Sequence, residues 1–250
     1  MAVIFILWLR EVKKYLRSRV QMVASLGAPL MYLGVLGFGL GPVFQRAGEG
    51  SYLQFVAPGV IGMTVLFTAM FSGIAMLWDR QFGFLKETLV APVPRLSIMI
   101  GRTLGGATVA ILQGTLIFVV TLIAGFRPAS VLAVPLAFLV IGLIAVVFAA
   151  LATAIGSTLK EMQGFQMVMN FFVMPIWFLS GALYPLQGLP RVLAALTRVD
   201  PLTYGVDGMR GILLGSERAH FGVAVDVAVL LAVGVVFVAA GAWRFSKIEA

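Results

Sequence analysis

The most constraining feature of this sequence is where its charged residues stand. The chain has 18 Lys and Arg and 10 Asp and Glu among 250 residues, and they fall in short clusters. A helix needs about 20 apolar residues to cross the hydrocarbon core of a bilayer. Lipid offers the backbone no hydrogen-bond partner, so a crossing segment must be helical. Long charge-free runs lie at 20–45, 50–78, 103–126, 128–159, 162–190 and 227–243, and the last is lengthened by 221–225 across Asp226.

These runs predict an all-α integral membrane protein with six transmembrane helices. Hydrophobic residues make up 61% of the chain, well above the roughly 45–50% of soluble domains. No polar stretch is long enough for a separate folded unit, so residues 1–250 form one membrane-embedded domain. The predicted spans are 21–44, 53–77, 99–124, 131–156, 163–183 and 221–243.

The distribution of positive charge predicts the topology. Cytoplasmic flanks of membrane spans collect Lys and Arg. With the N-terminus inside, twelve of these residues fall on inner segments and six on outer ones. Both termini are therefore predicted to be cytoplasmic. This distribution also explains the net charge of +8 without a nucleic-acid partner.

Residues 4–19 are predicted to form an amphipathic helix. Its basic residues recur at helical spacing, with Phe5, Trp8, Leu9, Val12 and Leu16 on the other face. Such a helix suits the membrane surface beside anionic lipid heads. The alternative is a charged start to the first span. The basic residues are Arg10, Lys13, Lys14 and Arg17.

A second short helix is predicted at 79–89, in the inner segment between spans two and three. Pro92 and Pro94 stop it. Such a helix either packs on its own bundle or docks with a soluble partner. Its charged residues are Asp79, Arg80, Lys86 and Glu87, and its apolar ones include Phe82, Phe84 and Leu85.

The outer segment 184–220 contains two apolar stretches, 192–199 and 206–214, that are too short to cross. They are predicted to be re-entrant helices, which membranes tolerate only where protein covers the backbone. Pro185 and Pro201 lie in this segment. Just before it, Pro175 and the Ser180-Gly181 pair would let the end of span five flex or terminate.

Small residues in span one favour close helix packing. Gly34, Gly37, Gly39 and Gly41 recur there, and small residues let membrane helices approach one another.

One side of span five is a candidate substrate path. Met and aromatic side chains adapt to varied apolar ligands, and a polar amide at mid-span is usually placed inward. Gln113 in span three is a weaker case of the same kind. The alternative is a packed or lipid-facing stripe. The path residues are Met167, Asn170, Phe171, Met174 and Phe178.

Few residues suit catalysis or metal binding. The chain has no Cys and one His, His220, so no metal site is expected. Asp207-Gly208-Met209-Arg210 is a fragment of the pattern of lipid-head-group phosphotransferases, but the further aspartates are missing. A proton-relay role for Asp226 in span six would suit a secondary transporter, although such carriers usually show several charges deeper in the membrane. An interfacial ion pair of Asp226 with Arg210 or Arg218 is expected instead.

Two motifs resemble the permease subunits of type-2 ABC exporters, in the branch of drug-resistance and of nodulation-factor or polysaccharide export permeases. The first is Lys86-Glu87-Thr88-Leu89-Val90-Ala91-Pro92-Val93-Pro94-Arg95 followed by Gly101-Arg102. The second is Pro175-x-Trp177-Phe178-Leu179-Ser180-Gly181-x-x-Tyr184-Pro185-Leu186-x-x-Leu189-Pro190, then Asp200-Pro201-Leu202-Thr203-Tyr204-x-x-Asp207-x-x-Arg210. The likeness covers nearly the whole chain. One departure is Asp200, where family members commonly have Asn.

The resemblance implies half of an exporter without its own ATPase. The chain indeed has no Gly-Lys dipeptide, which a phosphate-binding loop requires. ATP and Mg would bind a separate ATP-binding cassette subunit, and helix 79–89 would be the coupling helix that docks there. A second permease copy, identical or paralogous, would complete the path, surrounded by membrane lipids in a bacterial or archaeal-type cytoplasmic membrane. The expected substrate is drug-like or lipid-like, the alternative being a lipid-linked oligosaccharide or polysaccharide.

Overall fold

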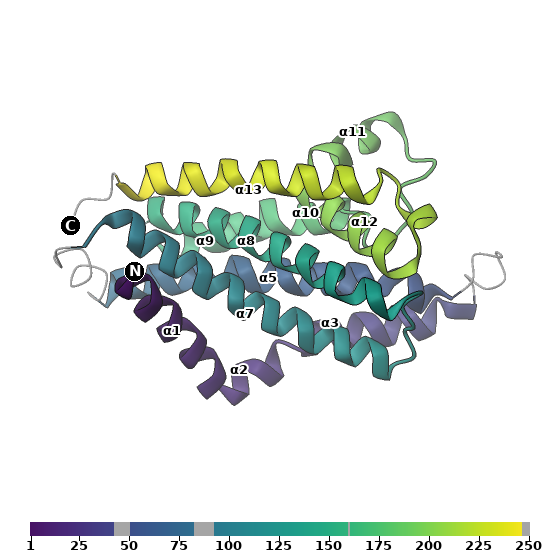
Figure 1. The fold of residues 1–250 in the computed structure, drawn as a ribbon, viewed down its shortest axis with the longest axis horizontal. Coiled ribbons are helices and arrows are strands. Elements are labelled where there is room, and N and C mark those ends of the chain that lie inside the picture. Colours follow the sequence, from purple (N-terminus) through teal and green to yellow (C-terminus); the bar gives the residue numbers. More distant parts are fainter. Residues whose placement is uncertain (43–50, 83–92, 160, 247–250) are drawn as a thin grey trace.

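The computed structural model describes residues 1–42, 51–82, 93–159 and 161–246. Helices account for nearly all of these residues, and none of them lies in a strand. The helices form an elongated bundle, with the N-terminus and the end of α13 at the same end (Figure 1). We call this the terminal end. The opposite end, which carries α11 and α12, is called the α12 end.

Five helical segments are long and apolar enough to cross a membrane. They coincide with the second to sixth predicted spans to within a few residues at each end. Three are single helices, α5 (Tyr52–Gln81), α7 (Arg95–Ile123) and α13 (Val223–Ser246). The fourth span joins the 3-10 turn η2 (Val131–Ala133) to α8 (Val134–Thr158), and the fifth is built of three parts described below.

The N-terminal part is more broken than the sequence predicted. It consists of α1 (Ala2–Arg17), α2 (Arg19–Ala24), α3 (Gly27–Tyr32) and the π-helical turn η1 (Leu33–Phe38). Ala2–Arg17 and Met22–Phe38 are bent by 77° relative to each other, and together they are the sixth candidate span. The predicted single helix 21–44 is interrupted because Pro29 suits the first turn of α3, where no backbone donor is needed.

Span five changes its helical type in the middle. It runs through α9 (Met162–Val168), the π-helical turn η3 (Met169–Val173) and α10 (Met174–Leu179). Pro175 is the second residue of α10, just after η3, and lacks the N–H that a continuous α-helix would use there. The segment ends at Leu179, where Ser180 accepts a hydrogen bond from the Ala182 N–H and Gly181 has a φ of +70°. This positive φ suits the glycine that terminates the span.

The segment after span five contains two unlike helices. The first, α11 (Arg191–Val199), is largely exposed. The second, α12 (Pro201–Leu214), is buried along almost its whole length and packs against α5, α8 and α13 (Figure 1). Asp200 caps α12 by accepting the Leu202 N–H at 2.8 Å, and burial raises the pKa of this carboxyl to about 7. A short turn, η4 (Ser216–Arg218), leads on to α13.

Glycines set the closest helix contacts, but they are not those of span one. A Cβ at Gly34, Gly39 or Gly41 would meet nothing within 4 Å among the described residues. Within this part of the chain, the close packing predicted for the series is found only at Gly37, which lies against Leu53. The tight contact lies between α5 and α8. A Cβ at Gly73 would come within 2.6 Å of the Ala152 carbonyl oxygen, and one at Gly156 within 2.9 Å of the Gly73 oxygen.

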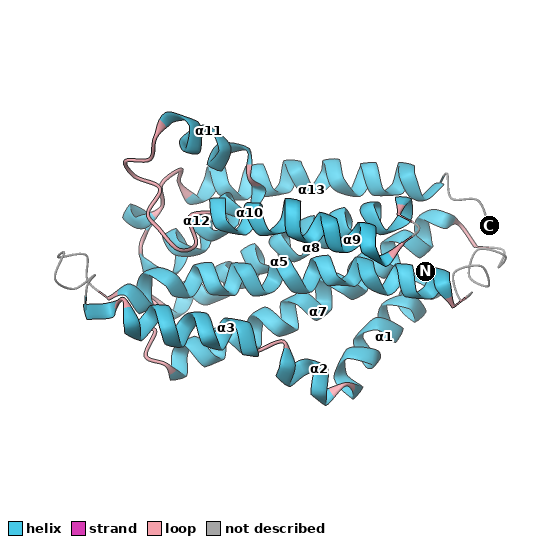
Figure 2. Cartoon of the chain, turned by 180° about the vertical axis from the view of Figure 1, so that it is seen from behind, coloured by secondary structure: helices cyan, strands magenta, loops and turns pink. Residues whose placement is uncertain are grey.

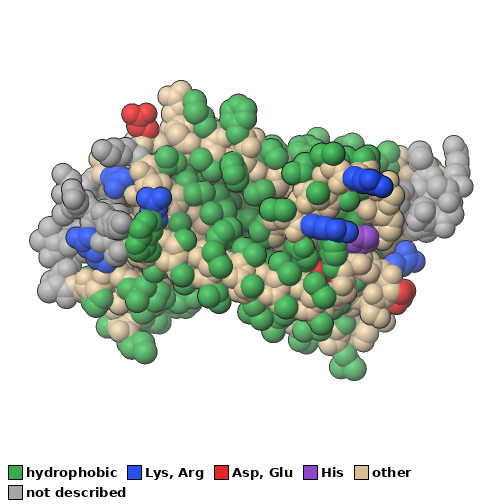
Figure 3. All heavy atoms as spheres, turned by 90° about the horizontal axis from the view of Figure 1, so that it is seen from above, with side chains coloured by type: hydrophobic (Ala, Val, Ile, Leu, Met, Phe, Trp, Pro, Cys, Tyr) green, Lys and Arg blue, Asp and Glu red, His purple; other side chains and the backbone are tan. Residues whose placement is uncertain are grey.

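Hydrophobic and charged side chains occupy different parts of the surface along the bundle. Figure 3 shows hydrophobic side chains over the middle of the molecule and charged ones toward its two ends. This is the distribution expected of a bundle whose middle faces hydrocarbon and whose ends face water.

The glycine contact gives a stability prediction. We expect Gly73→Ala to destabilise the protein by about 1–3 kcal/mol, because the new methyl group meets backbone that cannot move aside. Gly39→Ala is the matched control and should leave stability unchanged or slightly raised, because alanine favours helix and the site is open. Thermal unfolding of the purified chain in detergent measures both, and equal unfolding midpoints would contradict the assignment.

Candidate functional site

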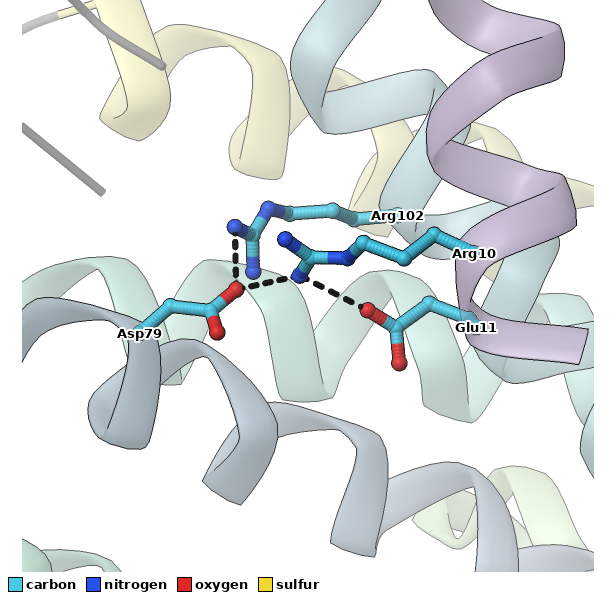
Figure 4. A network of polar contacts seen from close by, with 4 residues as sticks. All are labelled: Arg10, Glu11, Asp79 and Arg102. Atoms are coloured by element: carbon cyan, nitrogen blue, oxygen red, sulfur yellow. Dashed lines mark hydrogen bonds and ion pairs between the residues drawn. The ribbon is translucent and has the colours of Figure 1, made fainter. Parts of the chain in front are cut away.

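Four charged residues from three helices meet at the terminal end (Figure 4). Arg10 and Glu11 come from α1, Asp79 from the last turn of α5 and Arg102 from α7. Arg102 Nη2 lies 2.6 Å from Asp79 Oδ2, and Arg10 Nη2 donates to the same oxygen. Arg10 also lies 3.0 Å from Glu11 Oε1. We call these four residues the terminal-end cluster.

Burial decides which contact in the cluster matters most. The side chain of Arg102 is 6% exposed and that of Asp79 is 13% exposed, whereas Arg10 is 40% exposed. A buried charge without a partner is costly, so Asp79 is needed to neutralise Arg102. The pair fixes the end of α5 to the start of α7, and Arg10 adds α1 to the same junction.

The predicted coupling residues divide into two groups. Asp79 and Arg80 do not begin a new helix at 79, because α5 continues through them to Gln81. Asp79 belongs to the terminal-end cluster, and Arg80 Nη1 donates to the Leu159 carbonyl oxygen at 2.6 Å. Both residues therefore make contacts within the chain. Phe82 is exposed at the end of α5, and Phe84, Lys86 and Glu87 lie outside the described residues.

The helix α1 packs closely on α7. Trp8 Nε1 donates to Thr108 Oγ1 at 2.9 Å, and Tyr15 donates to the buried side chain of Gln113. A Cβ at Gly101 would lie 3.0 Å from the Ile4 carbonyl oxygen. Packing on α7 therefore decides which face of α1 is buried. Part of the predicted apolar face of α1, including Phe5 and Leu16, remains exposed.

The basic residues of α1 line a groove beside Asp79. Its volume is about 770 Å³, and it includes Arg10, Lys13, Lys14, Arg17 and Ser18. All four basic residues, Arg10, Lys13, Lys14 and Arg17, are exposed. The predicted basic face is therefore present on the surface of the chain.

All five candidate path residues lie on the exposed surface of the chain. They follow one side of α9, η3 and α10, seen in front of α8 in Figure 2, and the π-helical turn includes Asn170 and Phe171. Trp177 behind them is buried against Tyr32 and Phe67, with ring centroids 4.8 and 6.2 Å away. Spans one, two and five therefore share one face. The path residues are Met167, Asn170, Phe171, Met174 and Phe178.

The α12 end has a different polar arrangement from the one predicted. Asp226 is fully buried, and neither carboxylate oxygen has a hydrogen-bond partner among the described residues. The expected ion pair with Arg210 or Arg218 is wrong. Arg210 instead donates to the Gly181 carbonyl oxygen at 3.0 Å. Asp207, packed one helical turn before Arg210, accepts the backbone N–H groups of His220 and Phe221.

The two prolines singled out in the predicted re-entrant segment 184–220 occupy different kinds of position. Pro201 is the first residue of α12, a position that needs no backbone donor. Pro185 lies in the loop before α11 and lines a pocket at the α12 end.

Sequence reasoning missed the roles of Arg102 and Glu11. Arg102 is 23 residues from Asp79, and Arg10 is 69 residues from it. No local pattern links such distant positions. The one available signal is that Asp79 and Arg102 both interrupt or border long apolar runs, where an unpaired charge would be costly.

The cluster predicts a large asymmetry between its two carboxylates. We expect Asp79→Asn to cost about 3–5 kcal/mol of stability, because it leaves Arg102 buried and unpaired. Glu11→Gln should cost less than about 1 kcal/mol, because its partner Arg10 is substantially exposed. Thermal unfolding of the detergent-solubilised variants distinguishes them. Adding Arg102→Met should restore much of the stability lost in Asp79→Asn, and a double variant no better than the single one would argue against the pairing.

Comparison with known proteins identifies the family of this chain. Residues 2–214 match the family described as ABC-2 type transporter. Nodulation protein J of Rhizobium meliloti is 31% identical over 205 residues, covering 80% of this chain and 77% of the relative. Nodulation protein J of Rhizobium leguminosarum bv. trifolii is 33% identical over 196 residues, covering 78% and 74%. The inner membrane transport permease YadH of Escherichia coli K12 is 28% identical over 211 residues, covering 84% and 82%. The helical bundle and these matches together place the chain in the ABC-2 type transporter family, as a multi-pass membrane permease.

Proposed function

We propose that this chain is the transmembrane subunit of an ATP-driven exporter for an amphiphilic, drug-like or lipid-like substrate. The observation that carries the proposal is the exposed face shared by spans one and five in a member of the ABC-2 permease family. Large apolar side chains stand on it with a substantial part of their surface exposed. Its exposed residues include Met31, Val35, Phe38, Phe171, Met174 and Phe178.

Pairing with a second copy would use this face. Two chains facing each other through spans one, two and five would enclose a path lined by methionine and aromatic side chains, which adapt to varied apolar ligands. Trp177 supports the face from behind by joining Tyr32 and Phe67. The partner copy is an identical chain or a paralogue.

Six spans and cytoplasmic termini belong to the same proposal. Met22–Phe38 would be the first span, and α1 would lie along the inner membrane surface with Lys13, Lys14 and Arg17 near anionic lipid heads. The terminal end would then face the cytoplasm of a bacterial or archaeal-type cell. α11 would rest at the outer surface, and the buried α12 would be the re-entrant helix.

Energy would come from an ATP-binding cassette subunit that binds ATP and Mg. We assign the docking surface to the segment that follows α5, with Phe82 and Phe84 as apolar contacts and Lys86 and Glu87 as charged ones. Asp79 and Arg80 would hold the base of this segment against α1, α7 and the end of α8. Movement of the docked segment would thereby be passed to three helices together. Alternating access follows if ATP-bound and ATP-free partners favour different arrangements of the two bundles.

Charge reversal in the docking segment tests this assignment. The full chain is purified from its native membrane, and the proteins that co-purify with it are identified. We expect a stoichiometric ATP-binding subunit with the unmodified chain. Lys86→Glu combined with Glu87→Lys should lower ATP-dependent transport by about tenfold, corresponding to ~1.4 kcal/mol, while the chain stays in the membrane.

Glu161→Lys is the matched control, because Glu161 is an exposed carboxylate beside the end of α8 at the terminal end. It should leave transport and co-purification unchanged. A chain that purifies alone as an oligomer, with no ATPase, would overturn the exporter assignment. Unchanged transport in the double variant would overturn only the docking segment.

Asn170 gives a test of the path. It is the polar member of the exposed face, and it lies in a π-helical turn of the kind often found at functional sites. We expect Asn170→Leu to change the relative rates for different substrates by about fivefold, since one hydrogen bond contributes ~1 kcal/mol. The panel contains amphiphilic drugs, lipids and lipid-linked oligosaccharides.

Val235→Leu is the control, at an exposed position of α13 away from the proposed path. A panel in which the Asn170 and Val235 variants behave alike would remove Asn170 from the path. Selective transport of the oligosaccharides would identify the chain as a glycan exporter instead.

A further inference from the structure

A pocket of about 640 Å³ opens at the α12 end, away from the proposed path on spans one and five. It is formed by the start of α5, the turn between α7 and α8, the loop before α11, and α12 with the η4 turn. Three guanidinium groups and two carboxylates line it, together with His220. The cationic side chains are Arg127, Arg210 and Arg218, and the acidic ones are Asp207 and Glu217.

Arg210 is the least expected member of this pocket. Its side chain is only 5% exposed, and it makes no ion pair with any residue in the described part of the chain. Nη2 donates to the Gly181 carbonyl oxygen, and the guanidinium stands 4.1 Å from the centre of the Phe55 ring. Nε has no hydrogen-bond partner among the described residues. Burial lowers the pKa of Arg210 to about 10, so the group is still charged at neutral pH.

Asp207 attracts Arg210 electrostatically and partly offsets the effect of burial, but no carboxylate of the described residues forms an ion pair with it. Both oxygens of Asp207 accept backbone N–H groups, from His220 at 2.7 and 2.9 Å and from Phe221 at 2.8 Å. Glu217 belongs to the exposed η4 turn, where the neighbouring Arg218 supplies a positive charge of its own. A buried cation without an anion in direct contact is costly, and a bound anion would lower that cost.

We infer that this pocket binds a phosphate group, free or carried on the headgroup of an amphiphile, with Arg210 as its fixed cation. A guanidinium matches the oxygens of phosphate through paired, charge-assisted hydrogen bonds. Arg127 and Arg218 stand on separate elements around the same opening and add to the positive field. The pocket volume exceeds what a phosphate ion needs, and the side chains of Phe55, Pro185 and Leu214 supply apolar walls for the rest of a headgroup.

Binding is tested without ATP or an ATPase partner, so the result is independent of the exporter assignment. The full chain is reconstituted in nanodiscs of phosphatidylcholine. Inorganic phosphate, dihexanoyl phosphatidic acid and dihexanoyl phosphatidylcholine are then titrated, with calorimetry and the ligand-dependent shift of the unfolding temperature as readouts. We expect one saturable site per chain for inorganic phosphate, for dihexanoyl phosphatidic acid, or for both. The zwitterionic dihexanoyl phosphatidylcholine should bind more weakly or not at all.

Arg210→Gln should weaken binding roughly tenfold or more, the loss expected for a charged hydrogen bond. Arg191→Gln is the matched control, because it removes an arginine of the exposed α11 at the same end without touching the pocket. Arg218→Gln provides a second test on an exposed turn, should Arg210→Gln fail to fold, and it should weaken binding several-fold.

The two phosphate probes distinguish the source of the anion. Binding of inorganic phosphate supports a site for the free ion, and binding of phosphatidic acid alone supports a headgroup site. Absence of saturable binding for both probes overturns the inference. It is also overturned if the Arg218 and Arg191 variants bind as tightly as the unmodified chain and Arg210→Gln lowers the unfolding temperature without changing affinity.

Discussion

Hydrocarbon cannot hydrogen-bond to a peptide group, and the rest of this structure depends on that constraint. Every long apolar segment is helical because a helix satisfies its own backbone. Breaks occur where another group compensates. Pro29 stands in the first turn of α3, Pro175 follows a π-helical turn, and Ser180 accepts a backbone N–H where span five ends. The irregular backbone between spans five and six is tolerated because α12 is covered by α5, α8 and α13.

Within the bundle, packing depends on a few close contacts. The absence of side chains at Gly73 and Gly156 brings α5 and α8 together at backbone distance, which no larger residue would allow. Trp177 contributes from the other side, where its ring contacts Tyr32 and Phe67. These contacts make α5 the central helix, with spans three and four on one side and spans one and five on the other. The second group keeps an exposed apolar face, which is the face proposed to meet a second copy.

The two ends of the bundle treat buried charge differently. At the terminal end, Asp79 neutralises Arg102 and joins three helices, so the charge has a structural partner within the chain. At the α12 end, Arg210 is as deeply buried but meets a carbonyl oxygen and an aromatic ring. A paired charge holds helices together, whereas an unpaired one at the wall of a pocket is suited to bind an anion. The proposed exporter would thus have a rigid junction near its ATPase and a ligand-accessible cation at the opposite end.

The sequence alone determined the all-helical membrane fold and five of the spans, because hydrophobicity and charge placement act locally and need no knowledge of neighbours. It also located the end of span five at Ser180-Gly181 closely, but it predicted span one as a single helix and missed the interruption before Pro29. The partners of its charges were decided only by the tertiary structure. Asp79 pairs with Arg102 and Asp226 pairs with neither arginine proposed for it, because each helix can rotate about its axis until packing fixes it. The same holds for glycines. Among the described residues, Gly34, Gly39 and Gly41 of span one are open and Gly73 is enclosed, because spacing shows which helices could approach closely and only the packed bundle shows which do.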